Sequence, residues 1–140
     1  MSAEENKDLA RRWFEEGFTQ GNLDVADELF AADYVNHNAL PGQGTGPAGT
    51  KHNVIMLRSA FPDLETNVED QIAEGDKVAT RWTLSGTHHG ELMGAAPTGN
   101  RVTVTGIIIF RVAGGKAVEG WLNWDTLSLM QQIGAIPSPG

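Results

Sequence analysis

The 140-residue chain contains no cysteine, which excludes disulfide bonds, thiolate metal sites and cysteine nucleophiles. Basic residues are also scarce, because 10 lysines and arginines stand against 18 aspartates and glutamates, for a net charge of −8. An acidic surface repels phosphate backbones and anionic lipids, so we expect no nucleic-acid and no membrane partner. No apolar run approaches the roughly 20 residues that span a bilayer. The charged N-terminal segment lacks a signal-like apolar region, so we expect a cytoplasmic protein.

Several motifs of enzyme chemistry are missing as well. The glycine-rich segment 41–47 fits neither the dinucleotide-binding fingerprint nor the P-loop, which indicates a flexible loop. No serine stands in a Gly-x-Ser-x-Gly context, so we do not expect serine hydrolysis. The four histidines match no zinc-binding spacing. We therefore expect neither a metal nor a cofactor.

What is present favours a single domain over residues 1–140, with 40% hydrophobic residues to build its core. Helical spacing of apolar residues predicts three helices before residue 62, with a short extended piece over residues 34–38 between the second and the third. The first begins at a capping box of Ser2 and Glu5, buries Trp13 and Phe14, and stops at Gly21. From residue 64 the apolar period changes to two, which predicts strands near 65–73, 78–88, 101–112 and 117–125, followed by a helix over 126–133. Helices followed by an antiparallel meander indicate an α+β fold, with the helices on one face of a curved sheet.

The two expected hairpins predict which side chains share a face. Around Glu74-Gly-Asp76 we prefer a three-residue loop. It pairs Ile72 with Val78, Val68 with Trp82, and the opposite charges of Glu69 and Arg81. In the last hairpin, the Gly-Gly turn at 114–115 pairs Val112 with Ala117. Counting back without interruption gives one face that resembles a lined pocket, made of Ile108, Phe110, Glu119, Trp121, Asn123, Asp125 and the gap at Gly106.

The opposite face of this hairpin is apolar as well. It carries Val118, Leu122 and Trp124 from one strand, and Ile107 and Ile109 from the other. A sheet with two apolar faces must cover both, and the helices of so small a chain can cover only one. We therefore predict a homodimer that packs through the sheet face.

Asp125 is the strongest candidate for chemistry. It ends a strand beside Trp121, and aromatic neighbours desolvate the charged form of an acid, which suits proton transfer. The same residue is also a favoured cap for a helix that begins at Thr126, and the sequence allows both roles. His37, between two asparagines, is either a hydrogen-bonding or acid–base partner of a substrate carbonyl or an ordinary histidine at a loop edge.

A set of motifs distributed along the chain points to one family. They are Phe61-Pro-Asp-Leu, Glu74-Gly-Asp-Lys-Val-Ala-Thr-Arg-Trp, Gly86-Thr-His-His-Gly, Pro97-Thr-Gly, Phe110-Arg-Val and Gly115-Lys-Ala-Val-Glu-Gly-Trp-Leu-Asn-Trp-Asp125 running into Leu127-Ser-Leu-Met-Gln-Gln-Ile-Gly134. Over nearly its whole length the chain resembles the SnoaL-like polyketide cyclases. These belong to the nuclear transport factor 2-like superfamily, together with ketosteroid isomerase and scytalone dehydratase.

The resemblance implies a cone-shaped α+β barrel around an apolar pocket. It also implies cofactor-free ring closure of a polyketide methyl ester by intramolecular aldol condensation. In such cyclases an aspartate at the end of the last long strand is the acid–base catalyst, a position that falls on Asp125. His37, His88 or Asn123 would then hold the enolate or the accepting carbonyl. The expected substrate contacts are Trp13, Phe14, Asn36, Ile108, Glu119, Trp121 and Asn123.

Two sister chemistries are disfavoured. Ketosteroid isomerases use a tyrosine on the first helix, where this chain has Phe14 and Phe18, and its only tyrosine is Tyr34. The arrangement of limonene epoxide hydrolase needs an aspartate two residues from the strand arginine, and none stands so near Arg81. Two alternatives to the cyclase remain. One is isomerisation, hydration or dehydration of a small apolar carbonyl compound, and the other is a non-catalytic module that binds a small ligand.

Overall fold

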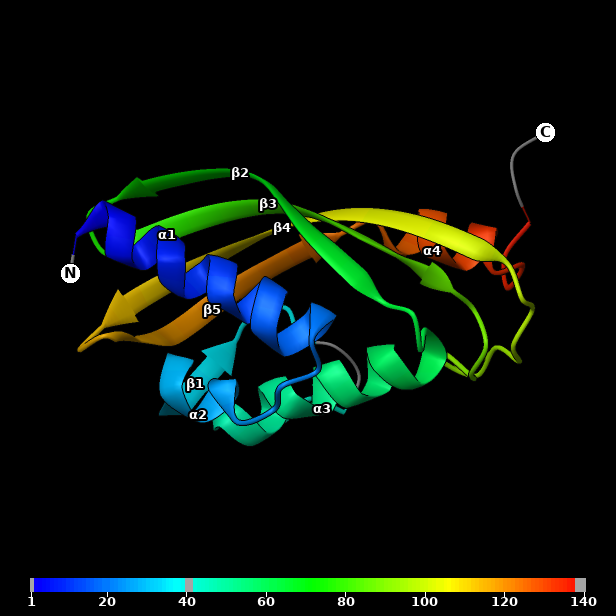
Figure 1. The fold of residues 1–140 in the computed structure, drawn as a ribbon, viewed down its shortest axis with the longest axis horizontal. Helices are drawn as coiled ribbons and strands as arrows, with labels where there is room; N and C mark the ends of the chain where they lie inside the picture. Colours follow the sequence, from blue (N-terminus) through cyan, green and yellow to red (C-terminus); the bar gives the residue numbers. More distant parts are fainter. Residues whose placement is uncertain (1, 40–41, 138–140) are drawn as a thin grey trace.

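The computed structural model describes residues 2–39 and 42–137, in which a curved sheet arches over the N-terminal helices (Figure 1). The helical segments are α1 (Ala3–Arg12), η1 (Trp13–Thr19), α2 (Val25–Leu29), α3 (Gly46–Ala60) and α4 (Thr126–Gln132). The strands are β1 (Phe30–Asn36), β2 (Glu65–Glu74), β3 (Lys77–Thr87), β4 (Arg101–Ala113) and β5 (Lys116–Trp124). The predicted α+β fold, with helices before the meander, is thus confirmed.

The first helix begins at the predicted capping box. The Ser2 hydroxyl accepts from the Glu5 backbone N–H at 3.1 Å, and the Glu5 carboxylate accepts from the Ser2 N–H at 3.2 Å. Beyond α1 the chain widens into the π-helical segment η1. The Trp13 ring lies across Gly17 there, because a Cβ at Gly17 would stand 2.6 Å from the ring atom Cε3. The glycine therefore lets a large indole fold back against its own helix.

The strand order across the sheet is β1-β5-β4-β3-β2. Strands β2 to β5 form the predicted antiparallel meander, whereas β1 pairs with β5 in parallel, so the sheet is mixed. The sequence indicated a short extended piece near Tyr34 without indicating its partner. Arg58 of α3 donates to the carbonyls of Phe18 and Thr19, at 2.8 and 2.9 Å, and so ties α3 to the end of η1.

The predicted three-residue loop between β2 and β3 is wrong. Glu74 pairs with Lys77, so the turn contains two residues. A β-bulge at Glu69 then adds one residue to β2, which restores the predicted pairing of Val68 with Trp82. The predicted register is therefore correct from Glu65 to Val68 and wrong from Asp70 to Glu74.

The bulge also removes the expected contact between Glu69 and Arg81. Asp70 is the residue opposite Arg81, and Glu69 accepts a hydrogen bond from the Thr83 hydroxyl at 2.9 Å. Gln71 follows the bulge and turns toward α1, where its amide donates to the Lys7 carbonyl at 2.9 Å. One extra residue thus changes which side chains of β2 face the helices.

A second bulge corrects the predicted register of the last hairpin. Val112 does pair with Ala117, but Arg111 pairs with Glu119, so Val118 is an extra residue. Every later pair is displaced by one: Phe110 faces Gly120, Ile108 faces Leu122 and Gly106 faces Trp124. Because side chains alternate along a strand, a displacement of one residue exchanges the two faces of β5. The expected pocket face is therefore correct for Gly106, Ile108 and Phe110 of β4 and wrong for β5. On β5, Gly120, Leu122 and Trp124 point inward in place of Glu119, Trp121 and Asn123.

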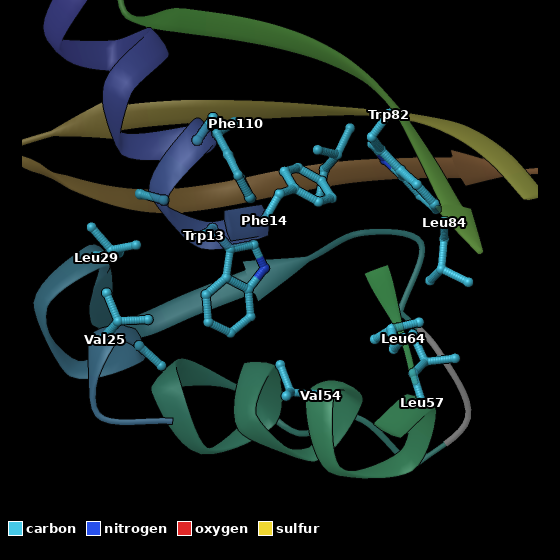
Figure 2. Packing of buried hydrophobic residues seen from close by; sticks show 14 of the residues in the cluster. Trp13, Phe14, Val25, Leu29, Val54, Leu57, Leu64, Trp82, Leu84 and Phe110 are labelled. Atoms are coloured by element: carbon cyan, nitrogen blue, oxygen red, sulfur yellow. The ribbon is translucent and has the colours of Figure 1, made fainter. Parts of the chain in front are cut away.

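The core lies between the inner face of the sheet and the helices below it. Figure 2 shows Trp13 and Phe14 from the N-terminal helical region between the sheet and α3, with Val54 rising from α3 toward them. Trp13 packs edge-on against Phe30, with the ring centroids 4.8 Å apart. Fully burying one such large side chain contributes about 1.5–3 kcal/mol. The helices therefore hold the sheet in its curved form through apolar contacts.

Candidate functional site

A cavity lies within this core, between the inner face of the sheet and the helices. Its apolar lining is Trp13, Phe14, Phe18, Phe30, Leu57, Trp82, Leu84, Ile108, Phe110, Leu122 and Trp124. Its polar lining is Tyr34, Asn36, Gln43, Thr50, Asn53 and Thr66. The open space is about 50 Å³, enough for a few waters, whereas small-molecule sites usually offer about 300–1,000 Å³. A ligand of several rings therefore requires some of these side chains to move.

The lining carries no formal charge. Among the described residues that border the cavity there is no aspartate, glutamate, lysine, arginine or histidine. Tyr34 is the one titratable residue of this set, and burial raises the pKa of its hydroxyl, so it stays protonated and neutral. Moving an unpaired charge into such surroundings costs several kcal/mol. The cavity thus favours neutral ligands.

Three of the polar side chains are tied to neighbouring groups. The Thr50 hydroxyl donates to a backbone carbonyl of its own helix at 2.7 Å. The Thr66 hydroxyl donates to the Phe14 carbonyl at 2.8 Å, which anchors β2 to η1. The Asn36 amide donates to the side-chain oxygen of Gln43 at 3.3 Å. These groups shape the cavity wall with their hydrogen bonds already formed.

Three other polar groups of the lining, two of them on aromatic side chains, have no hydrogen-bond partner among the described residues. Within the described residues, the indole N–H of Trp82 and the side-chain carbonyl oxygen of Asn53 are buried without a hydrogen bond. The Tyr34 hydroxyl also makes none with the described part of the chain, although the residue is only 1% exposed. Buried polar groups are nearly always paired, so these two donors and one acceptor mark positions where ligand atoms would bind.

Four of the residues predicted to contact substrate border the cavity: Trp13, Phe14, Asn36 and Ile108. The other three, Glu119, Trp121 and Asn123, lie on the outer face because of the bulge at Val118. Sequence reasoning missed Trp82, Asn53 and Tyr34. The alternation of β3 contained the signal for Trp82, since it faces inward opposite Gly106.

Asp125 lies outside the cavity, at the end of β5. Its carboxylate accepts from the Ser128 backbone N–H at 3.0 Å and caps α4, as one of its two predicted roles requires. It borders a groove on the outer face, together with Arg81, Asn123 and Trp124. Trp124 borders both this groove and the cavity, so the two spaces adjoin at this residue.

His37 belongs to a charged cluster on the outer face. Its Nε2 lies 2.7 Å from a carboxylate oxygen of Glu119, and its ring stacks on Trp121 at 5.1 Å. The guanidinium of Arg111 donates to the other Glu119 oxygen. The hydrogen bond from His37, followed by that from Arg111, lowers the pKa of Glu119. The histidine is therefore engaged away from the cavity.

His88 is buried at the far end of β3, also away from the cavity lining. Its Nδ1 lies 3.0 Å from the Thr98 hydroxyl, and its ring is 5.8 Å from that of Phe61. The structure does not bring His37, His88 and Asp125 together around one space. The catalytic parts predicted for the two histidines stay predictions, which activity measurements on His37→Asn and His88→Asn would test.

Two further properties concern the described ranges 2–39 and 42–137. Histidine, aspartate and glutamate side chains there form no group of three or more that could hold a metal ion. No helix in these ranges combines the length and apolarity needed to cross a membrane.

Comparison with known proteins places this chain in a family. Residues 8–133 match the model described as SnoaL-like polyketide cyclase. Over 120 residues the chain is 31% identical to the nogalonic acid methyl ester cyclase of Streptomyces nogalater, covering 84% of this chain and 89% of that protein. It is also 31% identical over 132 residues to the aklanonic acid methyl ester cyclase DnrD of Streptomyces peucetius, covering 91% of this chain and 89% of that protein.

A solved structure agrees with these relatives. TsrD from Streptomyces laurentii superimposes with a TM-score of 0.89 at 26% identity, covering 97% of this chain and 99% of that one. The family match, the related sequences and the shared fold each span most of the chain. The chain therefore belongs to the SnoaL-like polyketide cyclase family.

Proposed function

We propose that the protein closes a ring in a neutral aromatic polyketide ester by intramolecular aldol condensation, without a cofactor. One observation carries the proposal: the cavity of this cyclase-family chain is apolar, aromatic and uncharged among its described lining residues. A free carboxylate that entered the cavity would lose its hydration without meeting a cation, which is costly for a charged group. A methyl ester carries no charge and avoids that cost. Two relatives are named as cyclases of acid methyl esters, which agrees with this preference.

The reaction moves one proton and forms one carbon–carbon bond. A C–H bond next to a carbonyl breaks, the resulting enolate carbon attacks a second carbonyl, and the oxygen of that carbonyl takes a proton. Substrate and product therefore have the same mass. One acid–base residue can take the first proton and return it to the alkoxide, and hydrogen-bond donors that hold the enolate oxygen lower the barrier.

We assign the acid–base role to Asp125, acting when Trp124 moves aside. The substrate needs more room than the present 50 Å³, so the wall must yield somewhere. Trp124 is a wall residue shared by the cavity and the outer groove, and Asp125 borders that groove. Displacement of the Trp124 ring would thus enlarge the cavity and open it toward the carboxylate in one movement.

The test compares ring closure by wild type, Asp125→Asn and Asp125→Ser, measured by LC–MS on an anthraquinone β-keto methyl ester. Asparagine and serine also cap helices well, so α4 should persist in both variants while the carboxylate is lost. We expect a product of unchanged mass from wild type, and a rate at least 100-fold lower in both variants at similar melting temperatures. Wild-type rates in both variants would exclude Asp125 as the acid–base residue.

A second candidate function is supported by the same uncharged lining. A non-catalytic module that binds a neutral apolar ligand needs a cavity without an acid or base, and Asp125 is occupied as the cap of α4. Under this alternative, wild type retains the methyl ester in equilibrium dialysis and returns it uncyclised. Retention without product would therefore replace the cyclase with the binding module.

The homodimer also belongs to this proposal. The outer face of β4 and β5 exposes 46% of Ile107 and leaves Ile109, Val118 and Trp121 only partly covered. A second copy packed on this face would bury these side chains. Light scattering after size exclusion should give twice the 15.0 kDa of one chain at micromolar concentration, and a mass of one chain would exclude the dimer.

A further inference from the structure

Two aromatic residues present hydrogen-bond donors to the cavity, and each is held over a glycine. Trp82 lies across Gly106, where a Cβ would stand 2.4 Å from its ring atom Cζ2. Tyr34 lies over Gly120, where a Cβ would stand 2.2 Å from its hydroxyl oxygen. Both glycines are on the inner face of the sheet. The two residues therefore have their polar ends fitted closely against the sheet.

Aromatic rings pack around both donors. The Trp82 ring lies 5.6 Å from Phe14 and 6.2 Å from Trp124. The Tyr34 ring lies 4.7 Å from Phe30 and 6.1 Å from Phe110. Neither donor makes a hydrogen bond within the described chain. The indole N–H of Trp82 is fully buried without a partner, and a ligand oxygen that accepted from it would recover the cost of its lost hydration.

The two donors serve different parts of the cavity. Gly106 and Phe110 are four residues apart on β4, and Gly120 is the partner of Phe110, so the two glycines are separated by about 13 Å along the sheet. Ile108 and Leu122 form an apolar pair between them. A ligand that reached both donors would be elongated, apolar in the middle and supplied with an acceptor oxygen toward each end.

We infer that the Trp82 indole N–H and the Tyr34 hydroxyl each bind a carbonyl oxygen of an elongated, neutral, fused-ring ligand, and so determine which ligands the cavity accepts. The inference rests on the proposed function in placing such a ligand in this cavity, but it concerns binding and requires no turnover. Burial keeps Tyr34 protonated, so it donates across the physiological pH range. The indole N–H of Trp82 is a donor at every pH.

The test uses two neutral probes of similar shape in equilibrium dialysis, with bound probe measured by LC–MS. Dimethyl anthraquinone-2,6-dicarboxylate carries an ester carbonyl at each end, and 2,6-dipropylanthracene carries no carbonyl. We expect Trp82→Phe and Tyr34→Phe each to weaken binding of the ester about three- to tenfold and to change hydrocarbon binding less than twofold. Phe18→Leu is the control, because it alters an apolar lining residue and should affect both probes alike.

An unchanged ratio of ester to hydrocarbon affinity in both variants would overturn the inference, as would failure of wild type to bind either probe. Should Trp82→Phe not fold, Tyr34→Phe carries the test alone, because it removes a single hydroxyl and keeps every other cavity side chain. Selective loss of ester binding without any ring closure by wild type would sustain the inference and end the proposed cyclase function. Ring closure with wild-type KM in both Phe variants would sustain the proposed cyclase function and overturn the inference.

Discussion

The inner and outer faces of β4 and β5 are made from alternate residues of the same two strands, yet their chemistry is opposite. The inner face is uncharged and presents Ile108, Leu122 and Trp124 to the cavity. The outer face carries the cluster of Glu119 with His37 and Arg111. Ligand recognition and surface electrostatics are therefore separated by the thickness of one sheet. A change of a single residue in register would exchange them.

Neighbouring isoleucines on β4 give the largest expected contrast between the faces. Ile108 is 7% exposed on the inner face and Ile107 is 46% exposed on the outer face. Ile108→Ala should lower the free energy of unfolding by about 2–5 kcal/mol, because it leaves a hole in a packed wall. Ile107→Ala should lower it by less than about 1 kcal/mol. Urea unfolding followed by circular dichroism measures both values.

Repeating these unfolding measurements at several protein concentrations tests whether the outer face forms a dimer interface. If two copies pair through the outer face, the deficit of Ile107→Ala should grow with protein concentration, whereas that of Ile108→Ala should not. Equal losses in the two variants at every concentration would mean that the two faces are equally packed within one chain.

A second contrast lies within the inner face, at the contact of Gly120 with Tyr34. Gly120→Ala places a methyl group where the Tyr34 hydroxyl now stands, and should cost about 1–3 kcal/mol of unfolding free energy. Tyr34→Phe removes that hydroxyl. The double variant, Gly120→Ala with Tyr34→Phe, should therefore regain much of the unfolding free energy that Gly120→Ala loses. A double-mutant cycle in urea measures the coupling, and strictly additive effects would show that the hydroxyl does not press on the glycine.

Local patterns made the helices predictable from the sequence. The capping box of Ser2 and Glu5 and the aspartate cap at 125 each depend on residues three apart, and both form as expected. The alternation of β4 also placed Ile107 and Ile108 on opposite faces, as the structure has them. Signals of this kind are complete within one turn or one strand, so no distant contact has to be known.

The two bulges were not predictable, and they caused the errors at the site. In β5, Trp121 and Asn123 alternate as plausibly as Leu122 and Trp124, because an aromatic residue stands in each set. No glycine or proline marks Val118 or Glu69 as the extra residue. The bulges depend on how the sheet curves over the helices, which is a property of the assembled fold. The pocket was therefore expected on the wrong face of β5.

The smallest expected effect is the pH dependence of folding stability that Glu119 gives the outer face. His37 and Arg111 lower the pKa of Glu119 below its ordinary value of 4.5. The unfolded chain therefore binds a proton at a pH where folded Glu119 does not, and folding stability falls as pH decreases. The contribution of Glu119 is complete above pH 4.5 and is lost as the pH falls through the lowered value in the folded protein.

Glu119→Gln removes this contribution and should be measurably less stable than wild type near pH 7. Its deficit should shrink as the pH is lowered below 4.5, because wild-type Glu119 then becomes neutral as well. Ile108→Ala is the matched control, since no carboxylate borders the cavity among the described residues and its deficit should stay constant over the same range. Urea unfolding of the three proteins across this pH range would therefore assign acid sensitivity to the outer face. A constant deficit for Glu119→Gln would mean that its bonds to His37 and Arg111 contribute no net stability in solution, and that the two faces differ in packing but not in electrostatics.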